Sequence, residues 1–222
     1  MLSQLKKIKK VLVNRTNYDI KYLIFELYSL WVGKLSTEFN KFIYGSRLKI
    51  EAPFQVWGGI RFLIHGPGSI VIGKKFHAVS TRKRAFSTLF SPCHLTIIGD
   101  GKIILGEHVG LNGTTIISRK KISIGSNTMI GPNTIIADFD GHVVWPPSDR
   151  WTKSDAGSEI IIESDVWVGM NCIILKGVRI GCGSIIAAGS VVAGDVDPNS
   201  LYAGNPARKI KQLNDKGHQY NE

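Results

Sequence analysis

The sequence predicts a mainly β protein built as a parallel β-helix, and three observations support this prediction. A large aliphatic residue recurs at every sixth position at Ile162, Val168, Ile174, Ile180, Ile186 and Val192. Four residues after each stand small or medium side chains at Val166, Cys172, Val178, Ser184, Ser190 and Val196. Glycine, which permits tight turns, accounts for 24 of the 222 residues. A period of six is neither helical nor a simple strand alternation.

This period fits a short strand followed by a corner, so that three repeats of about six residues close one triangular coil. The same phase continues upstream with interruptions, at Leu105, Leu111, Ile117, Ile124, Ile130 and Ile136. Each aliphatic then points inward and stacks on its counterpart one coil away, at a strand spacing of about 4.8 Å. We expect corners with unusual dihedral angles at Gly125, Asn127, Gly131, Asn133, Gly177 and Gly183.

The phase breaks at residues 137–159, which contain two prolines, two tryptophans and many polar groups. We interpret this stretch as an excursion loop that leaves one corner of the β-helix. Long loops on regular scaffolds are often functional, although a tolerated surface insertion is the alternative. Trp145 and Trp151 favour the functional interpretation, because such large apolar side chains need something to cover them.

The composition places the chain among globular proteins. Hydrophobic residues make up 43% of the sequence, which argues against a disordered chain. The cysteines Cys93, Cys172 and Cys182 are too few for a disulfide framework and lack metal-ligand spacing, which favours a reducing compartment. The sequence contains neither an 18-residue apolar run nor a signal peptide with a small-residue cleavage site. We therefore expect a soluble, cytoplasmic protein.

The positive charge is concentrated at the N-terminus. Residues 1–50 hold ten Lys/Arg against three acids, that is +7 of the net charge of +11. Such a segment is either a solvated helix face or a peripheral membrane contact; a nucleic-acid partner is not expected, because no reader motif accompanies the charges. Helical spacing predicts an amphipathic helix over 19–33, with Asn17 as N-cap and an apolar face that closes one end of the β-helix, made of Ile20, Leu23, Ile24, Leu27, Leu30 and Trp31.

We therefore divide the chain into a basic N-terminal helical segment (1–50), a β-helix domain (51–205) and a basic C-terminal tail (206–222) that closes the other end. Residues 164–211, SDVWVGMNCIILKGVRIGCGSIIAAGSVVAGDVDPNSLYAGNPARKIK, resemble the C-terminal half of the hexapeptide-repeat acetyltransferases. Residues 111–142, LNGTTIISRKKISIGSNTMIGPNTIIADFDGH, are similar to the preceding coils of the branch that modifies cell-surface polysaccharides. The resemblance covers roughly residues 50–212 and implies a left-handed β-helix that uses acetyl-CoA as co-substrate.

Acetyl transfer to an alcohol needs a base, a held thioester and donors for the developing oxyanion. Of the six histidines, His142 lies in the excursion loop, and DFDGH matches the family's catalytic segment, so we predict that His142 is the general base. Asp138 and Asp140 are candidates to hold its imidazole, or else stabilise an Asx-type turn. Asn112 matches a position where relatives carry a polar residue that reaches the acceptor or the oxyanion; stabilising a corner is the alternative.

The donor site follows from the resemblance alone. Gly169, Met170 and Ala188 match the coils that line the pantetheine arm, where small residues let the arm approach the wall or are simply required by the corners. Arg208 and Lys211 match basic positions near the CoA phosphates. Ala193-Gly194 replaces a frequent Thr-Lys pair, which leaves one phosphate contact in question. Trp167 matches a frequent tryptophan, with a role at the substrate or in packing between subunits. The relatives assemble as trimers with each active site between two subunits, so a homotrimer is implied.

The leading hypothesis is an O-acetyltransferase acting on a sugar of a surface polysaccharide or its lipid-linked or nucleotide-linked precursor. N-acetylation of an amino sugar uses the same base and donor and stays open. A zinc enzyme on the same fold requires converging histidines, and the spacing of the histidines here provides no close pair, so no metal is expected. A non-catalytic assembly subunit would keep the aliphatic ladder; the presence of His142, Arg208 and Lys211 together argues against it.

Overall fold

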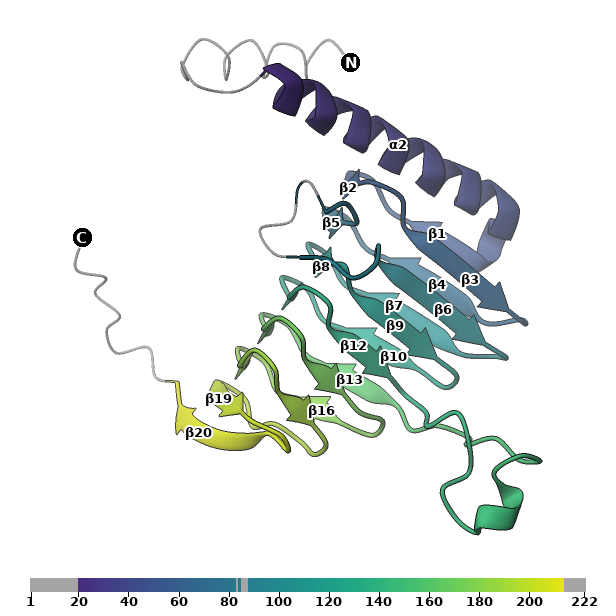
Figure 1. Ribbon diagram of the computed structural model, residues 1–222, viewed down its shortest axis with the longest axis vertical. Helices are drawn as coiled ribbons and strands as arrows, with labels where there is room; N and C mark the ends of the chain where they lie inside the picture. The colour runs from purple at the N-terminus through teal and green to yellow at the C-terminus, as the bar shows by residue number, and fades with distance from the viewer. Residues whose placement is uncertain (1–19, 83, 85–87, 214–222) are drawn as a thin grey trace.

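The computed structural model describes residues 20–82, 84 and 88–213 and forms a left-handed parallel β-helix with a helix across its N-terminal end (Figure 1). The three faces of the β-helix are parallel sheets, which we call A, B and C. Sheet A consists of β1 (Leu48–Ile50), β4 (Ser69–Ile72), β7 (Lys102–Leu105), β10 (Ile122–Ile124), β13 (Ile160–Ile162) and β16 (Arg179–Ile180). Sheet C consists of β3 (Arg61–His65), β6 (His94–Ile98), β9 (Thr115–Ser118), β12 (Ile135–Ala137), β15 (Ile173–Ile174) and β18 (Val191–Val192).

Sheet B ends in the one antiparallel strand pairing that the structure gives within the described ranges. Its parallel part consists of β2 (Phe54–Trp57), β5 (Phe76–Val79), β8 (Gly110–Asn112), β11 (Met129–Ile130), β14 (Trp167–Val168), β17 (Ile185–Ile186) and β19 (Ser200–Ala203). Strand β20 (Arg208–Gln212) then runs antiparallel to β19. Two short 3-10 helices, η1 (Gly45–Arg47) and η2 (Pro147–Asp149), complete the secondary structure of the described residues.

The core is a set of aliphatic columns inside the coil, as the six-residue period predicts. In sheet A, Ile103, Ile122 and Ile160 occupy successive rungs in register, and each is 0% exposed. All of the aliphatics at every sixth position from Ile162 to Val192 are buried, as are the residues four positions after each of them. Because the inward side chains of each coil stack on those of the next, burial of apolar surface rather than local strand propensity stabilises these short strands.

The corners confirm part of the prediction and correct the rest. Left-handed backbone angles occur, as expected, at Asn127, Asn133, Gly177 and Gly183. Gly125 and Gly131 do not adopt a positive φ and are required for a different reason. A Cβ at Gly125 would lie 2.4 Å from the backbone nitrogen of Ser164 in the next coil. These two glycines therefore allow the coils to stack closely, whereas the asparagines turn the chain.

Helix α2 (Ile20–Tyr44) lies across the N-terminal end of the β-helix as predicted, but it is longer than expected and its apolar face points the other way. Small residues face the coil: Ser29, Gly33 and Thr37 are buried, and a Cβ on Gly33 would lie 2.0 Å from the carbonyl oxygen of Val56. Of the apolar residues expected to cover the coil, Ile24, Leu27 and Trp31 are exposed. The proposed N-cap Asn17 lies outside the described residues.

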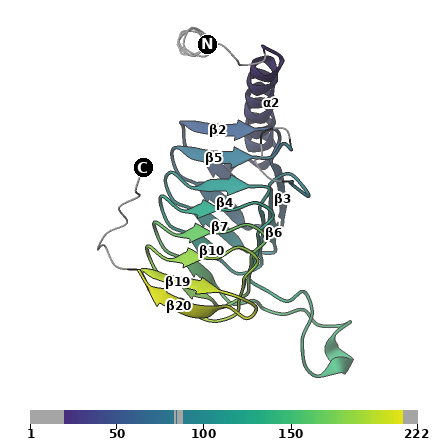
Figure 2. The same ribbon diagram turned by 60° about the vertical axis from the view of Figure 1, so that its left-hand side comes forward.

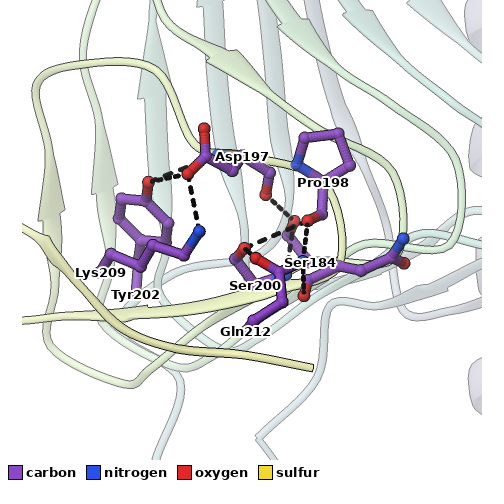
Figure 3. Close-up of polar contacts among 8 residues, drawn as sticks. Ser184, Asp197, Pro198, Ser200, Tyr202, Lys209 and Gln212 are labelled. Atoms are coloured by element: carbon purple, nitrogen blue, oxygen red, sulfur yellow. Dashed lines mark hydrogen bonds and ion pairs between the residues drawn. The ribbon is translucent and has the colours of Figure 1, made fainter. Parts of the chain in front are cut away.

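The opposite end is closed by the β19–β20 pair, which confirms the prediction for the described part of the tail. Figure 3 shows the polar contacts that hold it: the Ser200 hydroxyl donates to Gln212 Oε1 (3.1 Å), and the Tyr202 hydroxyl donates to Asp197 Oδ2 (3.2 Å). Lys209 Nζ lies 2.9 Å from the same carboxylate oxygen. The Lys209 ammonium and the Tyr202 hydroxyl lower the pKa of Asp197. Lys209 is thus committed to a structural ion pair.

Candidate active site

The excursion loop leaves sheet C after Ala137 and returns to sheet A at Ile160, so it occupies one corner of the triangular coil. Figures 1 and 2 both show it projecting away from the β-helix, with η2 at its far end. Trp145 and Trp151 remain 76% and 92% exposed, so the described residues do not provide the cover that the sequence predicts for them. A loop this exposed is held by specific polar contacts at its base.

Asp138 anchors the start of the loop. Its carboxylate is 0% exposed and accepts hydrogen bonds from the Ser118 hydroxyl (2.7 Å) and from the backbone amides of Arg119 (2.7 Å) and Lys120 (3.0 Å). The Asp138 carbonyl in turn accepts from the backbone amide of Ser158 on the returning strand of the loop (2.7 Å). Because a buried carboxylate is costly unless it is fully hydrogen-bonded, this arrangement fixes where the loop begins.

A lysine from the next coil holds the neck of the loop together. Lys176 Nζ lies 2.6 Å from Asp140 Oδ2 and 2.8 Å from Asp155 Oδ2, so one ammonium joins the outgoing and returning segments of the loop at its neck. The hydrogen bonds that Lys176 donates to the Asp140 and Asp155 carboxylates raise the pKa of Lys176, and the bond to Asp155 lowers the pKa of that carboxyl. The Asp140 backbone amide also donates to Asp155 Oδ2 (3.0 Å). Neither Lys176 nor Asp155 was found by sequence analysis, because nothing in the spacing marks this long-range contact.

His142 is exposed on the loop, and its tautomer is fixed by a backbone carbonyl. Its Nδ1 lies 2.7 Å from the carbonyl oxygen of Arg150. Because a carbonyl oxygen can only accept, Nδ1 must carry the hydrogen and donate it. The neutral ring therefore keeps a lone pair on Nε2 that can accept a proton. The edge of the Trp151 ring packs against the imidazole, with the ring centroids 6.1 Å apart.

The structure corrects the expectation that Asp138 or Asp140 orients His142. Both carboxylates are occupied elsewhere, by Ser118 and two backbone amides for Asp138 and by Lys176 for Asp140. The hydrogen-bond partner that the structure gives to the imidazole is the Arg150 carbonyl. The two aspartates instead position the loop that carries the histidine. Sequence analysis missed Arg150 because a backbone carbonyl leaves no signature in residue type.

Asn112 and Trp167 lie on sheet B. Asn112 ends β8, and its side-chain oxygen Oδ1 is buried with no hydrogen-bond partner in the described part of the chain. An unpaired buried acceptor is costly, so this oxygen lacks a stabilising hydrogen bond that buried polar atoms normally make. Trp167 in β14 is 52% exposed and lies in register between Met129 and Ile185 on the outer face of the sheet.

The residues expected to line the donor site follow sheet B toward the C-terminal end. Met170 and Ala188 are exposed after β14 and β17. Gly169 is explained by coil stacking, because a Cβ there would lie 2.6 Å from the backbone nitrogen of Ala188. On β20, Arg208 and Lys211 are exposed, and the contact given for the Arg208 guanidinium is with the carbonyl of Ala207. Neither side chain has an ion-pair partner within the described residues.

One chain does not bring these two sets of residues together. Figures 1 and 2 place the loop with His142 and the strand β20 with Arg208 and Lys211 on different sides of the β-helix. The histidine belongs to the corner between sheets C and A, whereas Asn112, Trp167 and the expected donor residues belong to sheet B and the corner that follows it. A site that uses both sets needs a second subunit.

Comparison with known proteins agrees with this architecture. Residues 159–194 match the family model described as bacterial transferase hexapeptide (six repeats). The Escherichia coli galactoside O-acetyltransferase is 36% identical over 118 residues, which cover 51% of this chain and 57% of that protein. A solved galactoside acetyltransferase in complex with coenzyme A is 27% identical, with a TM-score of 0.50 over 69% of this chain and 66% of that one.

The Bacillus cereus N-acyltransferase AntD, solved as a mutant with coenzyme A and dTDP-4-amino-4,6-dideoxyglucose, shares the fold with a TM-score of 0.60 at 23% identity, over 80% of this chain and 89% of that one. The chain spans 44%, 57% and 33% of the lengths of the first three curated relatives that it matches. The repeats, their register and the corner loop define a hexapeptide-repeat β-helix protein. This chain is similar to the hexapeptide-repeat transferases over residues 159–194.

Proposed function

We propose that this protein is an acetyl-CoA-dependent acetyltransferase that acetylates a sugar hydroxyl of a surface polysaccharide or its precursor. The observation that carries the proposal is the state of His142, an exposed histidine whose Nδ1 donates to the Arg150 carbonyl and whose Nε2 is left as a base. The similarity to a galactoside O-acetyltransferase and to a galactoside acetyltransferase solved with coenzyme A supports both the reaction and the donor.

In the proposed reaction, Nε2 of His142 accepts the proton of the sugar hydroxyl as its oxygen attacks the thioester carbonyl carbon. A carbon–oxygen bond forms, the carbonyl electrons move to the oxygen, and the resulting oxyanion is stabilised by hydrogen-bond donors. When the carbon–sulfur bond breaks, the imidazolium returns the proton to the departing thiolate of CoA. The Arg150 carbonyl keeps the ring in the required tautomer through both steps, since it also stabilises the cationic form.

The remaining residues bind and position the substrates. Asn112 offers its unpaired Oδ1 to the acceptor and its amide group to the acceptor or the oxyanion. The pantetheine arm passes the exposed corners at Met170 and Ala188, next to Trp167, and the phosphates meet the exposed cationic side chains of Arg208 and Lys211. A homotrimer places the loop of one subunit beside sheet B of the next, which agrees with the separation of these two sets within one chain.

Calorimetric titration with acetyl-CoA and with dephospho-CoA tests the donor site. We expect micromolar binding of acetyl-CoA, weaker binding without the 3′-phosphate, and weaker binding to the Arg208→Ala variant, because a charge-assisted contact is lost. Lys209→Ala is the matched control, since Lys209 is already paired with Asp197. If the native protein fails to bind acetyl-CoA, the transferase proposal is wrong and a non-catalytic assembly subunit becomes the better explanation.

N-acetylation of an amino sugar is the second candidate, because the same Nε2 serves an amine acceptor. A curated relative that is 41% identical over 91 residues is an N-acetyltransferase. An ammonium group cannot attack until it loses its proton, so the transfer rate onto an amine rises steeply toward the pKa of that amine. A screen of sugar and amino-sugar acceptors with labelled acetyl-CoA, repeated across the pH range, separates an ester product from an amide product.

A further inference from the structure

Helix α2 carries a continuous apolar stripe that the other described residues leave uncovered. The outer stripe consists of Ile24, Tyr28, Trp31, Leu35, Phe39 and Phe42, whose exposed fractions are 61%, 60%, 60%, 51%, 64% and 83%. Successive members are three or four residues apart, so they line one face of the helix. At about 1.5 Å per residue, the stripe runs for roughly 27 Å. A contiguous apolar surface of this kind marks an interaction site.

The inner face shows that the stripe is not needed for folding. Ser29, Gly33 and Thr37 pack against the first coil, where the backbone amide of Gly58 donates to the Ser29 carbonyl (3.0 Å). Glu26 secures the same side by accepting from Trp57 Nε1 (3.2 Å) and by pairing with Arg84 (2.5 Å). A helix that used its apolar residues for the core would be oriented the other way, so the outward orientation calls for a partner.

The charge around the stripe indicates what that partner is. Lys34 is exposed on α2, and both acids of the helix are neutralised, Glu26 by Arg84 and Glu38 by Lys41 at 3.0 Å. The sequence that directly precedes the helix, residues 1–19, contains five basic residues, Lys6, Lys7, Lys9, Lys10 and Arg15, against one acid, Asp19. An apolar stripe that follows this basic segment in the sequence fits a lipid bilayer that is apolar in its interior and anionic at its surface.

We propose that α2 docks the protein on an anionic lipid surface, with the outer stripe inserted at the boundary between headgroups and acyl chains. Tyr28 and Trp31 suit this boundary because their rings are apolar with a polar tip. No helix among the described residues is long and apolar enough to cross a bilayer, so α2 lies along the surface. Figures 1 and 2 show α2 at the N-terminal end of the β-helix.

Vesicle co-sedimentation of the full chain tests the proposal. We expect binding to vesicles of three parts phosphatidylcholine to one part phosphatidylglycerol, and weaker binding to phosphatidylcholine alone or at high salt. The double substitution Trp31→Ser/Phe39→Ser removes two inserted rings and should weaken partitioning about tenfold or more. Phe90→Ser is the matched control, because Phe90 is 72% exposed but lies outside the helix. Circular dichroism establishes that all variants keep the native fold.

Two outcomes would overturn the proposal. One is vesicle binding that Trp31→Ser/Phe39→Ser leaves unchanged, or that Phe90→Ser reduces equally. The other is absence of vesicle binding together with a smaller assembly for the double variant in analytical ultracentrifugation, which would assign the stripe to a second copy of the chain. Vesicle binding is measured without acetyl-CoA, so its failure leaves the proposed transfer reaction standing, and failure of the transfer reaction leaves lipid docking standing.

Discussion

The coils from β13 to β18 and the loop between β12 and β13 are adjacent in sequence but are held in place by different forces. In the coils, Ile162, Ile174 and Ile180 are at most 1% exposed, and each repeat buries one such residue. In the loop, Trp145 and Trp151 face solvent, and polar contacts at Asp138 and Lys176 fix its base.

This difference separates stability from chemistry. The buried aliphatic side chains give the coils their free energy of folding and take no part in the proposed reaction. The loop buries little and contributes little to stability, so its exposed histidine is free to meet a substrate. Loops on rigid scaffolds commonly carry function for this reason. Substitutions of the buried aliphatic residues of the coils should therefore change stability, and substitutions of exposed loop residues should change activity.

The largest effect is expected for His142→Ala. Removing the base should lower the rate of transfer about 10²- to 10⁴-fold, while the melting temperature and acetyl-CoA binding stay near the native values because the side chain is exposed. Steady-state kinetics and thermal unfolding measure the two quantities. His65→Ala, an exposed histidine outside the loop, is the control and should retain native activity. Near-native turnover of His142→Ala would show that another group is the base.

The next effect belongs to the coils. Ile174 is 0% exposed, and Ile174→Ala should lower the free energy of unfolding by about 2–5 kcal/mol, because it removes buried methyl groups and leaves a cavity. The loop residue Val144 is 63% exposed, so Val144→Ala should change stability by less than about 0.5 kcal/mol. Urea denaturation compares them. Equal losses in both variants would mean that the loop is part of the folding core.

The coils could be predicted from the sequence because each six-residue repeat places an aliphatic residue at the position that is buried. The orientation of α2 could not be predicted in this way. Helical spacing reveals an apolar face but not which partner covers it, and the signal that decides it is the small-residue face of Ser29, Gly33 and Thr37. The loop histidine was visible through the DFDGH motif, whereas its partner, the Arg150 carbonyl, and the Lys176 contacts depend on how the loop closes.

A smaller effect is expected at the start of the loop. Asp138→Asn keeps the size of the side chain but replaces one acceptor oxygen with an NH₂ donor. In one orientation this donor faces the Arg119 amide, and in the other it faces the Lys120 amide and the Ser118 hydroxyl. Leaving such buried groups unpaired should cost about 1–3 kcal/mol and reduce turnover by misplacing His142. Asp149 lies in the same loop and forms a surface ion pair with Lys153. Asp149→Asn should leave stability and turnover nearly unchanged. If the two variants behave alike, Asp138 does not anchor the loop.

The smallest effect concerns Lys176, which joins the outgoing and returning segments of the loop at its neck. Lys176→Gln removes partly exposed ion pairs worth about 1 kcal/mol or less, so hydrogen exchange of the loop amides should rise roughly two- to fivefold while the coils stay protected.

The lowered pKa of Asp155 means that this stabilisation is present above the ordinary carboxyl pKa and is lost as the pH falls through the lowered value. The raised pKa of Lys176 means that it is present below the ordinary amine pKa and is lost only as the pH rises through the raised value. Hydrogen exchange, corrected for intrinsic rates, should therefore separate the native chain from Lys176→Gln at neutral pH and less so in acid; a difference that persists unchanged in acid would show that the lysine acts by packing rather than by charge.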